Sequence, residues 1–374
     1  MTSKLLDSKV IDLIRFPLAF FVIIHHSFGK PIEGLCNNFL ELNAYNQVRC
    51  LFSHVLVHID VPTFFFISGY LFFLTMPEKW DWNLYRHKMI KKSKTLLVPY
   101  LLWNIIALFV SYLIKYLFYH ENLETIFSEF KKSGLGFLWG SETINRVDFG
   151  VFGFNYVEHY PINGPLWFMR DLMVMMLISP IIYWLIKRRR GIFIIVIFSL
   201  LYILRLPSLI TGLSWVACTF FSFGAYFSLN KKSFTIYFYR KVFGITCLTL
   251  LLFALDVFFD GGHYGGAIVH PIFIMCFMIT FANFATYAVK SEILSKLVNL
   301  KQHCFFLYAG HMGLSLVFIF QYLYRKVIPD TSCNLLLVTR YFLIIFTVTL
   351  SCMLLDKMLK FLFPKTMNFI TGNR

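Results

Sequence analysis

Residues 55–76 read VLVHIDVPTFFFISGYLFFLTM. This stretch holds one acidic residue, Asp60, and neither Lys nor Arg. About 20 mainly apolar residues are enough for a helix to cross the hydrocarbon core of a bilayer. The stretch therefore predicts a membrane-spanning helix rather than the core of a soluble domain.

Similar apolar stretches recur along almost the whole chain. The 374 residues are 58% hydrophobic and 14% charged, whereas about a quarter of the residues of a typical soluble protein are charged. We identify ten candidate spans: residues 10–28, 55–76, 95–119, 165–186, 191–209, 213–229, 242–259, 267–289, 304–324 and 335–355. The sequence thus predicts an all-α, polytopic integral membrane protein with about ten transmembrane helices. We expect residues 1–374 to form one transmembrane domain, with no separate soluble domain.

The net charge of +16 has a distribution typical of membrane topology. The basic residues fall in clusters between apolar stretches, at residues 86–94, 187–190, 231–232, 240–241, 290–301 and 357–374. Alternate loops are basic, which is the positive-inside pattern. It predicts a multi-pass protein of the cell membrane with both termini in the cytoplasm, and it explains the charge without nucleic-acid binding. The apolar start, with Arg15, His25 and His26 and no small-residue cleavage site, predicts a retained helix rather than a signal peptide.

The eight cysteines include no CxxC pair and no metal-ligand spacing. Cys36 and Cys50 lie in an expected external segment, where a disulfide between them is one of the alternatives. His54 and His58 are spaced to share a helix face, but no third metal ligand is evident. We therefore expect surface histidines and no bound metal.

Arg15 and His26 are the strongest candidates for catalytic residues. They are eleven positions apart, which places both on one face of a helix and about 16 Å apart along it. Ionisable groups inside a membrane span are functional candidates by default. The cation can hold a phosphate-bearing donor, and the imidazole can act as a general base on a hydroxyl. The alternative is that Arg15 reaches the inner headgroups while His26 hydrogen-bonds at the outer interface.

Further candidates lie in four other segments. Lys91, Lys92 and Lys94 are candidates for donor phosphates or for an anchor to anionic lipids. Ser68 and Tyr70 follow Pro62 in a segment suited to close helix packing or to lining a cavity. Trp167 is either a sugar-stacking or an interfacial residue, and Asp171 beside Arg170 is a candidate for orienting His26. Tyr308 and His311 line a donor path or are satisfied interior residues.

These segments together resemble the acyltransferase-3 family of membrane proteins. The resemblance rests on Arg15-x10-His26, FFFISGY at residues 64–70, LLVPY at 96–100, PLWFMRDL at 165–172 and FFLYAGH at 305–311. It implies a ten-helix core that O-acylates, usually O-acetylates, extracytoplasmic glycans with cytoplasmic acyl-CoA as the donor. The family's Arg and His correspond to Arg15 and His26. Many glycan-acetylating members have a Glu where this chain has Arg170-Asp171, and many carry an appended domain that we do not expect here.

We therefore expect an O-acyltransferase that uses acyl-CoA as donor substrate, with no bound cofactor. Its expected partners are membrane lipids and an extracytoplasmic polysaccharide or lipid-linked glycan. The alternative is a transporter or export component for such a glycan, because buried Arg, His and Asp also mark transport paths. No pair of interrupted spans is evident from the sequence, which leans against transport. The sequence does not define the acyl group, the sugar or the oligomeric state.

Overall fold

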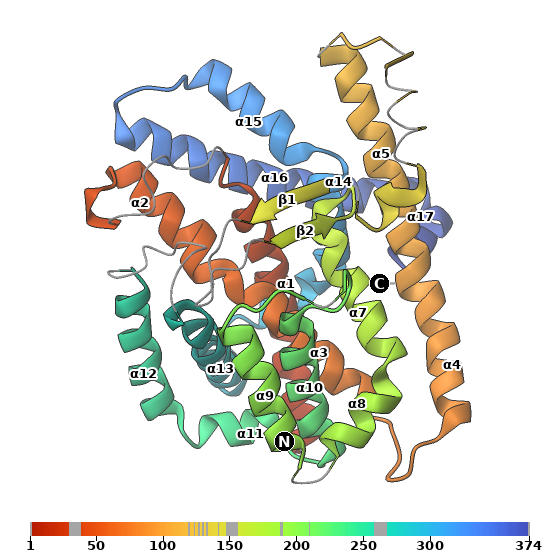
Figure 1. Ribbon diagram of the computed structural model, residues 1–374. Helices are drawn as coiled ribbons and strands as arrows, with labels where there is room; N and C mark the ends of the chain where they lie inside the picture. Colours follow the sequence, from red (N-terminus) through yellow and green to blue (C-terminus); the bar gives the residue numbers. More distant parts are fainter. Residues whose placement is uncertain are drawn as a thin grey trace.

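A computed structural model describes residues 2–29, 39–118, 120–122, 124–125, 128, 131, 134–140, 142–146, 156–187, 190–208, 210–257 and 268–372. All ten apolar stretches form helices, as the sequence predicts. The α-helices shown in Figure 1 are α1 (Ser3–His26), α2 (Ala44–Cys50), α3 (Asp60–Phe73), α4 (Trp82–Lys92), α5 (Val98–Phe118), α7 (Trp167–Leu177), α8 (Ser179–Ile186), α9 (Gly191–Ile203), α10 (Trp215–Leu229), α11 (Phe234–Tyr239), α12 (Val242–Leu255), α13 (Val269–Lys290), α14 (Cys304–Gly313), α15 (Leu316–Val327), α16 (Asn334–Leu362) and α17 (Pro364–Thr371).

Short helical turns and one hairpin complete the described chain. The turns are η1 (Phe39–Glu41), η2 (Leu51–Leu56), η3 (Val57–Ile59), η4 (Ser93–Leu97), η5 (Gly134–Leu138), η6 (Gly164–Leu166) and η8 (Ser295–His303). Strand β1 (Glu142–Arg146) pairs with β2 (Tyr156–Tyr160) in antiparallel register, with Glu142 opposite Tyr160. The sequence did not predict this hairpin, which lies in the segment expected to be a long external loop.

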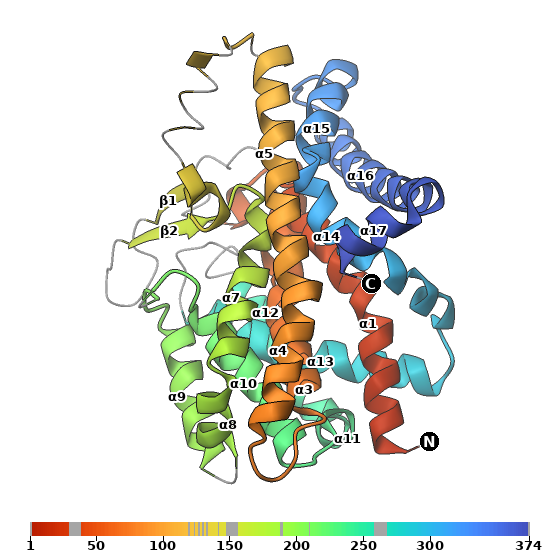
Figure 2. The ribbon, with the colours of Figure 1, turned by 90° about the vertical axis from the view of Figure 1, so that its right-hand side faces the viewer.

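Two of the expected spans begin earlier than the sequence suggested. Helix α2, the π-helical turn η2, the turn η3 and α3 follow one another as a single apolar span, Ala44–Phe73. Helices α4 and α5, joined by the π-helical turn η4, form a second long span, which follows one edge of the molecule in Figure 1 and runs down its middle in Figure 2. The η4 turn stands just before Pro99, whose ring and missing N–H are not compatible with a regular α-helical ladder at that point.

The predicted count of ten separate spans is not reproduced. Among the described residues, four helices are long and apolar enough to cross a membrane: Ala44–Phe73, Trp82–Leu117, Val269–Lys290 and Asn334–Leu362. The count rises to six if each of two bent pairs is one span, Gly164–Leu177 with Ser179–Ile186 (67°) and Ser295–Gly313 with Leu316–Val327 (63°). Helix α1 is outside this set, and it carries five charged residues between Lys4 and Arg15.

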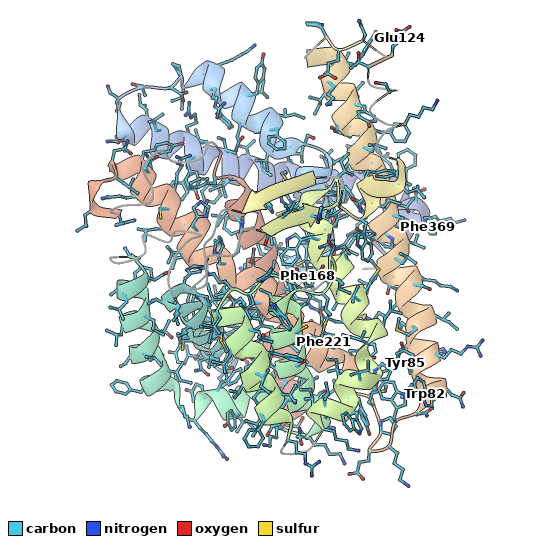
Figure 3. All side chains as sticks on the ribbon, viewed as in Figure 1. Trp82, Tyr85, Glu124, Phe168, Phe221 and Phe369 are labelled. Carbon is cyan, nitrogen blue, oxygen red and sulfur yellow. The ribbon has the colours of Figure 1, made fainter. Side chains whose placement is uncertain are left out.

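Helices α3 and α10 cross with almost no space between their backbones. A Cβ built on Gly69 would lie 2.0 Å from the carbonyl oxygen of Phe221, and one on Gly224 would lie 2.0 Å from that of Phe66. In lipid, such close approach through small residues supplies the van der Waals contact that holds helices together. The FFFISGY segment therefore serves helix packing at Gly69, which was the simpler of its two interpretations. Phe221 and Phe168 lie in the interior among the helices (Figure 3).

Helix α1 is surrounded by other helices along most of its length. It packs against α3, α13, α14 and α16, and eleven of its residues are buried. Near its start, the buried Asp7 carboxylate accepts hydrogen bonds from Tyr70 Oη (2.8 Å), Ser233 Oγ (2.8 Å) and Thr235 Oγ1 (2.6 Å). These bonds join α1 to α3 and α11 and compensate the cost of burying the carboxylate.

Candidate functional site

Arg15 and His26 lie on the same uninterrupted helix, as the sequence predicts. Helix α1 runs from Ser3 to His26, so the two side chains are separated by about 16 Å along one helix face. Both are partly buried rather than fully exposed. The surroundings of the two residues differ, and they define two sets of side chains at the two ends of this face.

His26 belongs to a cluster of imidazoles, which we call the histidine end: His25, His26, His58, His270 and His311. The ring of His26 lies 5.0 Å from that of His25 and 5.2 Å from that of His311, centroid to centroid. His25 lies 4.7 Å from His58. Four elements, α1, η3, α13 and α14, bring these rings together, although their residues are up to 286 positions apart in the chain.

His311, which was expected along the donor path, lies beside His26. Its side chain is fully buried, and its Nδ1 donates a hydrogen bond to the Leu307 carbonyl oxygen at 2.7 Å. The Nε2 atom is therefore the other ring nitrogen, and no described residue gives it a hydrogen bond. A buried polar atom without a partner is costly, so its retention points to a ligand or a reacting group.

On the other side of the cluster, hydrogen bonds join His58 to His270 and His270 to Asp256, and we call these three residues the array. His58 Nδ1 lies 2.9 Å from His270 Nε2, and His270 Nδ1 lies 2.8 Å from Asp256 Oδ2. The expectation that His54 and His58 are surface histidines is wrong, since His54 is only 5% exposed and the His58 ring is hydrogen-bonded to His270. The physical reason is that residues 44–54, which were expected in an external loop, form helical turns that run on into α3, with Ser53 and His54 buried.

The other set surrounds Arg15, and we call it the basic end: Arg15, Lys301, His303 and Lys360. Asp12 joins Arg15 (3.4 Å) to Lys301 (2.7 Å). Asp356 is buried and pairs with His303 Nδ1 (2.5 Å) and Lys360 Nζ (2.8 Å). Lys360 also donates to the carbonyl oxygen of Gln302, so α1, η8 and α16 meet here.

Asp171 is not brought to His26. Arg170 donates to Asp171 Oδ1 at 3.0 Å and to the backbone oxygens of Trp139 (2.7 Å) and His159 (2.8 Å). The second carboxylate oxygen of Asp171 accepts from the backbone N–H of Ser214. Asp171 therefore pairs with Arg170 and not, as proposed, with His26. The Arg170–Asp171 pair links α7 to the residue after η5, to β2 and to the residue before α10.

The remaining predicted residues are dispersed. Tyr70 donates to Asp7, near the start of α1, so it lies at the opposite end of that helix from His26 and not on the expected acceptor side. Ser68 is partly buried on α3. Tyr308 donates to the Pro165 carbonyl oxygen, and Trp167 lies 6.3 Å from Phe65, ring to ring.

The three lysines of the expected donor site lie where α4 turns into η4. Lys91 and Lys94 are exposed and Lys92 is partly buried. The η4 turn adjoins the end of α17, where a Cβ on Gly372 would come within 2.6 Å of the Thr95 carbonyl oxygen. The structure thus brings these lysines to the C-terminal segment that follows Lys360, while no contact between them and Arg15 is seen. Cys36 lies outside the described residues, so the Cys36–Cys50 disulfide is not defined.

The rule for intramembrane ionisable residues would have located Asp256, His270 and Asp356, which the sequence reasoning passed over. Each stands in or beside an apolar stretch, where such groups are rare. The sequence could not show that Asp256 lies beside His270 or that Asp356 lies beside His303. Within the described ranges, no three His, Cys, Asp or Glu side chains are arranged to hold a metal ion.

These features define a helical membrane protein whose interior holds a histidine and carboxylate array at one end of a helix and a cluster of cations at the other. Residues 9–357 match the model of the acyltransferase domain of the acyltransferase-3 family, so the chain belongs to this family.

One curated relative is the succinoglycan biosynthesis protein ExoH of Rhizobium meliloti (strain 1021). The two chains are 31% identical over 183 residues, which is 48% of this chain and 44% of the relative. The chain therefore spans less than half the length of that relative. No solved structure matches the chain.

Proposed function

We propose that this protein is a membrane O-acyltransferase that moves an acyl group, most simply acetyl, from cytoplasmic acyl-CoA to a hydroxyl of an extracytoplasmic polysaccharide or lipid-linked glycan. The proposal includes a multi-pass topology in the cell membrane with both termini cytoplasmic and about ten crossings. Ten crossings require that α1, the shorter apolar helices and both bent pairs also traverse the bilayer. The printed name of the relative, a polysaccharide biosynthesis protein, supports the choice of a glycan acceptor.

One observation carries the proposal: a single helix face joins the basic end to the histidine end. Arg15, Lys301 and Lys360 are cationic side chains and suit the phosphates of a nucleotide thioester. The rings of His26 and His311 lie 5.2 Å apart, centroid to centroid, and an imidazole can act as a general base on a hydroxyl. With the nucleotide at Arg15, the thioester arm extends along α1 and presents its acyl carbon near His26.

The chemical step follows from these positions. His26 takes the proton of the acceptor hydroxyl while the hydroxyl oxygen bonds to the acyl carbon. The carbon–sulfur bond breaks, and the CoA sulfur leaves with the proton that His26 returns. In the alternative order, His26 first carries the acyl group itself and then passes it to the hydroxyl. Both routes consume one thioester and release one free thiol.

The experiment uses purified protein in vesicles, labelled acetyl-CoA and a pool of cell-surface glycans. We expect label in the glycan and an equal release of thiol from wild type, and neither from His26→Ala. His87→Ala is the matched control, because His87 is an exposed histidine on α4. Full transferase activity of folded His26→Ala would contradict the assignment of His26.

Transport of a glycan is the alternative that a specific observation favours. The two helices broken by 67° and 63° were not expected from the sequence, and discontinuous helices mark substrate sites in transporters. The same experiment separates the two functions, because a transporter moves the glycan without stoichiometric consumption of acetyl-CoA.

A further inference from the structure

Asp256 is a buried carboxylate with one visible partner. Its side chain is fully buried, and among the described residues only His270 gives it a hydrogen bond. Its second oxygen, Oδ1, is also buried and has no partner there. A buried carboxylate with so few hydrogen bonds requires a compensating positive charge nearby. His270, its hydrogen-bond partner, is a neighbouring group that can carry this charge as an imidazolium.

The hydrogen bonds of the array determine which ring nitrogens of His270 and His58 are donors. An ionised carboxylate can only accept, so His270 Nδ1 carries the proton that points to Asp256. In the neutral ring, His270 Nε2 is then an acceptor, and His58 Nδ1 donates to it. The Nε2 atom of His58 is left as the basic nitrogen of the array. This is the arrangement by which a carboxylate holds an imidazole in one tautomer in hydrolytic triads.

The array continues toward His26. His58 lies 4.7 Å from His25, and His25 lies 5.0 Å from His26, ring centroid to ring centroid. The terminal torsion of histidine is soft, so small ring rotations bring nitrogens at such spacings within hydrogen-bond reach. A continuous series of imidazoles therefore joins the proposed base to a carboxylate more than 220 positions away in the chain.

We propose that Asp256, His270 and His58 are positioning residues that fix the imidazoles around His26 and hold the proton removed from the acceptor hydroxyl. This inference rests on the proposed function. The proton passes from the hydroxyl to His26 and, through His25, to the array, where the Asp256 carboxylate balances the positive charge. When the carbon–sulfur bond breaks, the proton returns by the same route to the CoA sulfur, which leaves as a thiol. No further reactant is needed.

A purely structural role is the competing explanation, because a buried Asp–His pair also holds α12 to α13. The chain offers a matched control for that role. Thr249 on α12 and Thr280 on α13 share a partly buried hydrogen bond at 2.8 Å between the same two helices. Thr249→Val removes a polar link of that interface without touching the array.

The test compares Asp256→Asn, Asp256→Glu, His270→Gln and Thr249→Val as full-length proteins in vesicles. We expect Asp256→Asn and His270→Gln to lower kcat about 100-fold while the KM for acetyl-CoA stays within about twofold. Asp256→Glu keeps the carboxylate and should recover at least about tenfold of that loss. Thr249→Val should retain kcat. Equal kcat in wild type and Asp256→Asn, or equal losses in Asp256→Asn and Thr249→Val, would overturn the proposal.

A second measurement does not require turnover. The 15N spectra of histidine-labelled protein should show His58 and His270 as hydrogen-bonded rings whose signals change in Asp256→Asn and stay unchanged in Thr249→Val. Identical spectra in wild type and Asp256→Asn would show that the array does not exist. If wild type transferred no acyl group, the proposed function and the catalytic part of this inference would fall, while the spectra would still decide whether the array holds a proton.

Discussion

The described part of the chain includes two buried Asp–His pairs, and their neighbours differ. At the histidine end, Asp256 pairs with His270, and the next partner along is another imidazole, His58. At the basic end, Asp356 pairs with His303, and its second partner is the ammonium of Lys360. A neutral imidazole has one nitrogen that donates a proton and one that accepts it, whereas an ammonium only donates. The same pair is thus suited to proton transfer at one end and to anion binding at the other.

This difference predicts that variants at one end change kcat and that variants at the other end change the KM for acyl-CoA. Variants at the histidine end should lower kcat, because they remove groups that act on the reacting atoms. Variants at the basic end should raise the KM for acyl-CoA, because they remove charges that meet the distant phosphates.

The largest effect is expected at His26. Replacement by Gln keeps a polar side chain of similar length but no base, so kcat should fall about 1,000-fold or more with little change in the KM for acetyl-CoA. Steady-state release of CoA thiol measures both constants. A tenfold rise in KM with kcat retained would place His26 on the donor-binding side instead.

The next effect concerns the α3–α10 crossing, which belongs to neither end. Gly69→Ala places a methyl group against the Phe221 carbonyl, and we expect a loss of about 3 kcal/mol of folding stability. Thermal unfolding in detergent measures it. Gly244→Ala is the control, since a Cβ there meets nothing within 4 Å, and it should leave stability equal or slightly higher. Equal unfolding temperatures for the two variants would show that the crossing is looser than described.

At the basic end, Arg15→Ala should raise the KM for acetyl-CoA about tenfold, corresponding to about 1.4 kcal/mol of binding free energy, with kcat within about twofold. Acetylpantetheine, which lacks the nucleotide phosphates, is the matched substrate. Its turnover should be equal in wild type and Arg15→Ala. An equal loss with both donors would show that Arg15 acts on the thioester region.

The smallest effect is expected at Lys301, which is 42% exposed and shares Asp12 with Arg15. Its charge is screened by solvent, so Lys301→Ala should raise the KM for acetyl-CoA only about threefold. The difference from wild type should shrink between about 0.05 M and 0.5 M salt. A difference that is independent of salt would indicate a role in packing rather than in phosphate binding.

Much of the fold was predictable because apolar stretches of membrane length specify helices by their own composition. The ten stretches are all helical, but composition did not reveal where helices bend, as at Leu314 and Ser315 between α14 and α15. Ser315 adopts a left-handed conformation, φ 52°, that nothing in the apolar pattern signals.

The site was predictable only within one helix. Helical periodicity fixed the relation of Arg15 to His26, because both are in α1. Partners on other helices depend on tertiary packing, so Asp171 was matched to His26 by depth alone and in fact pairs with Arg170. His54 and His58 were judged to be surface residues because no third metal ligand was evident, whereas both lie within the helical run from Ala44 to Phe73 and contact other histidines or Phe28.

The central claim is that an acyl group passes along α1 from one side of the membrane to the other. The most direct measurement uses sealed vesicles with the protein in one orientation, labelled acetyl-CoA only on the side of the chain termini and the glycan only on the opposite side. The account predicts labelled glycan with wild type and none with His26→Gln. Label that enters the glycan only when both substrates share one side would contradict it.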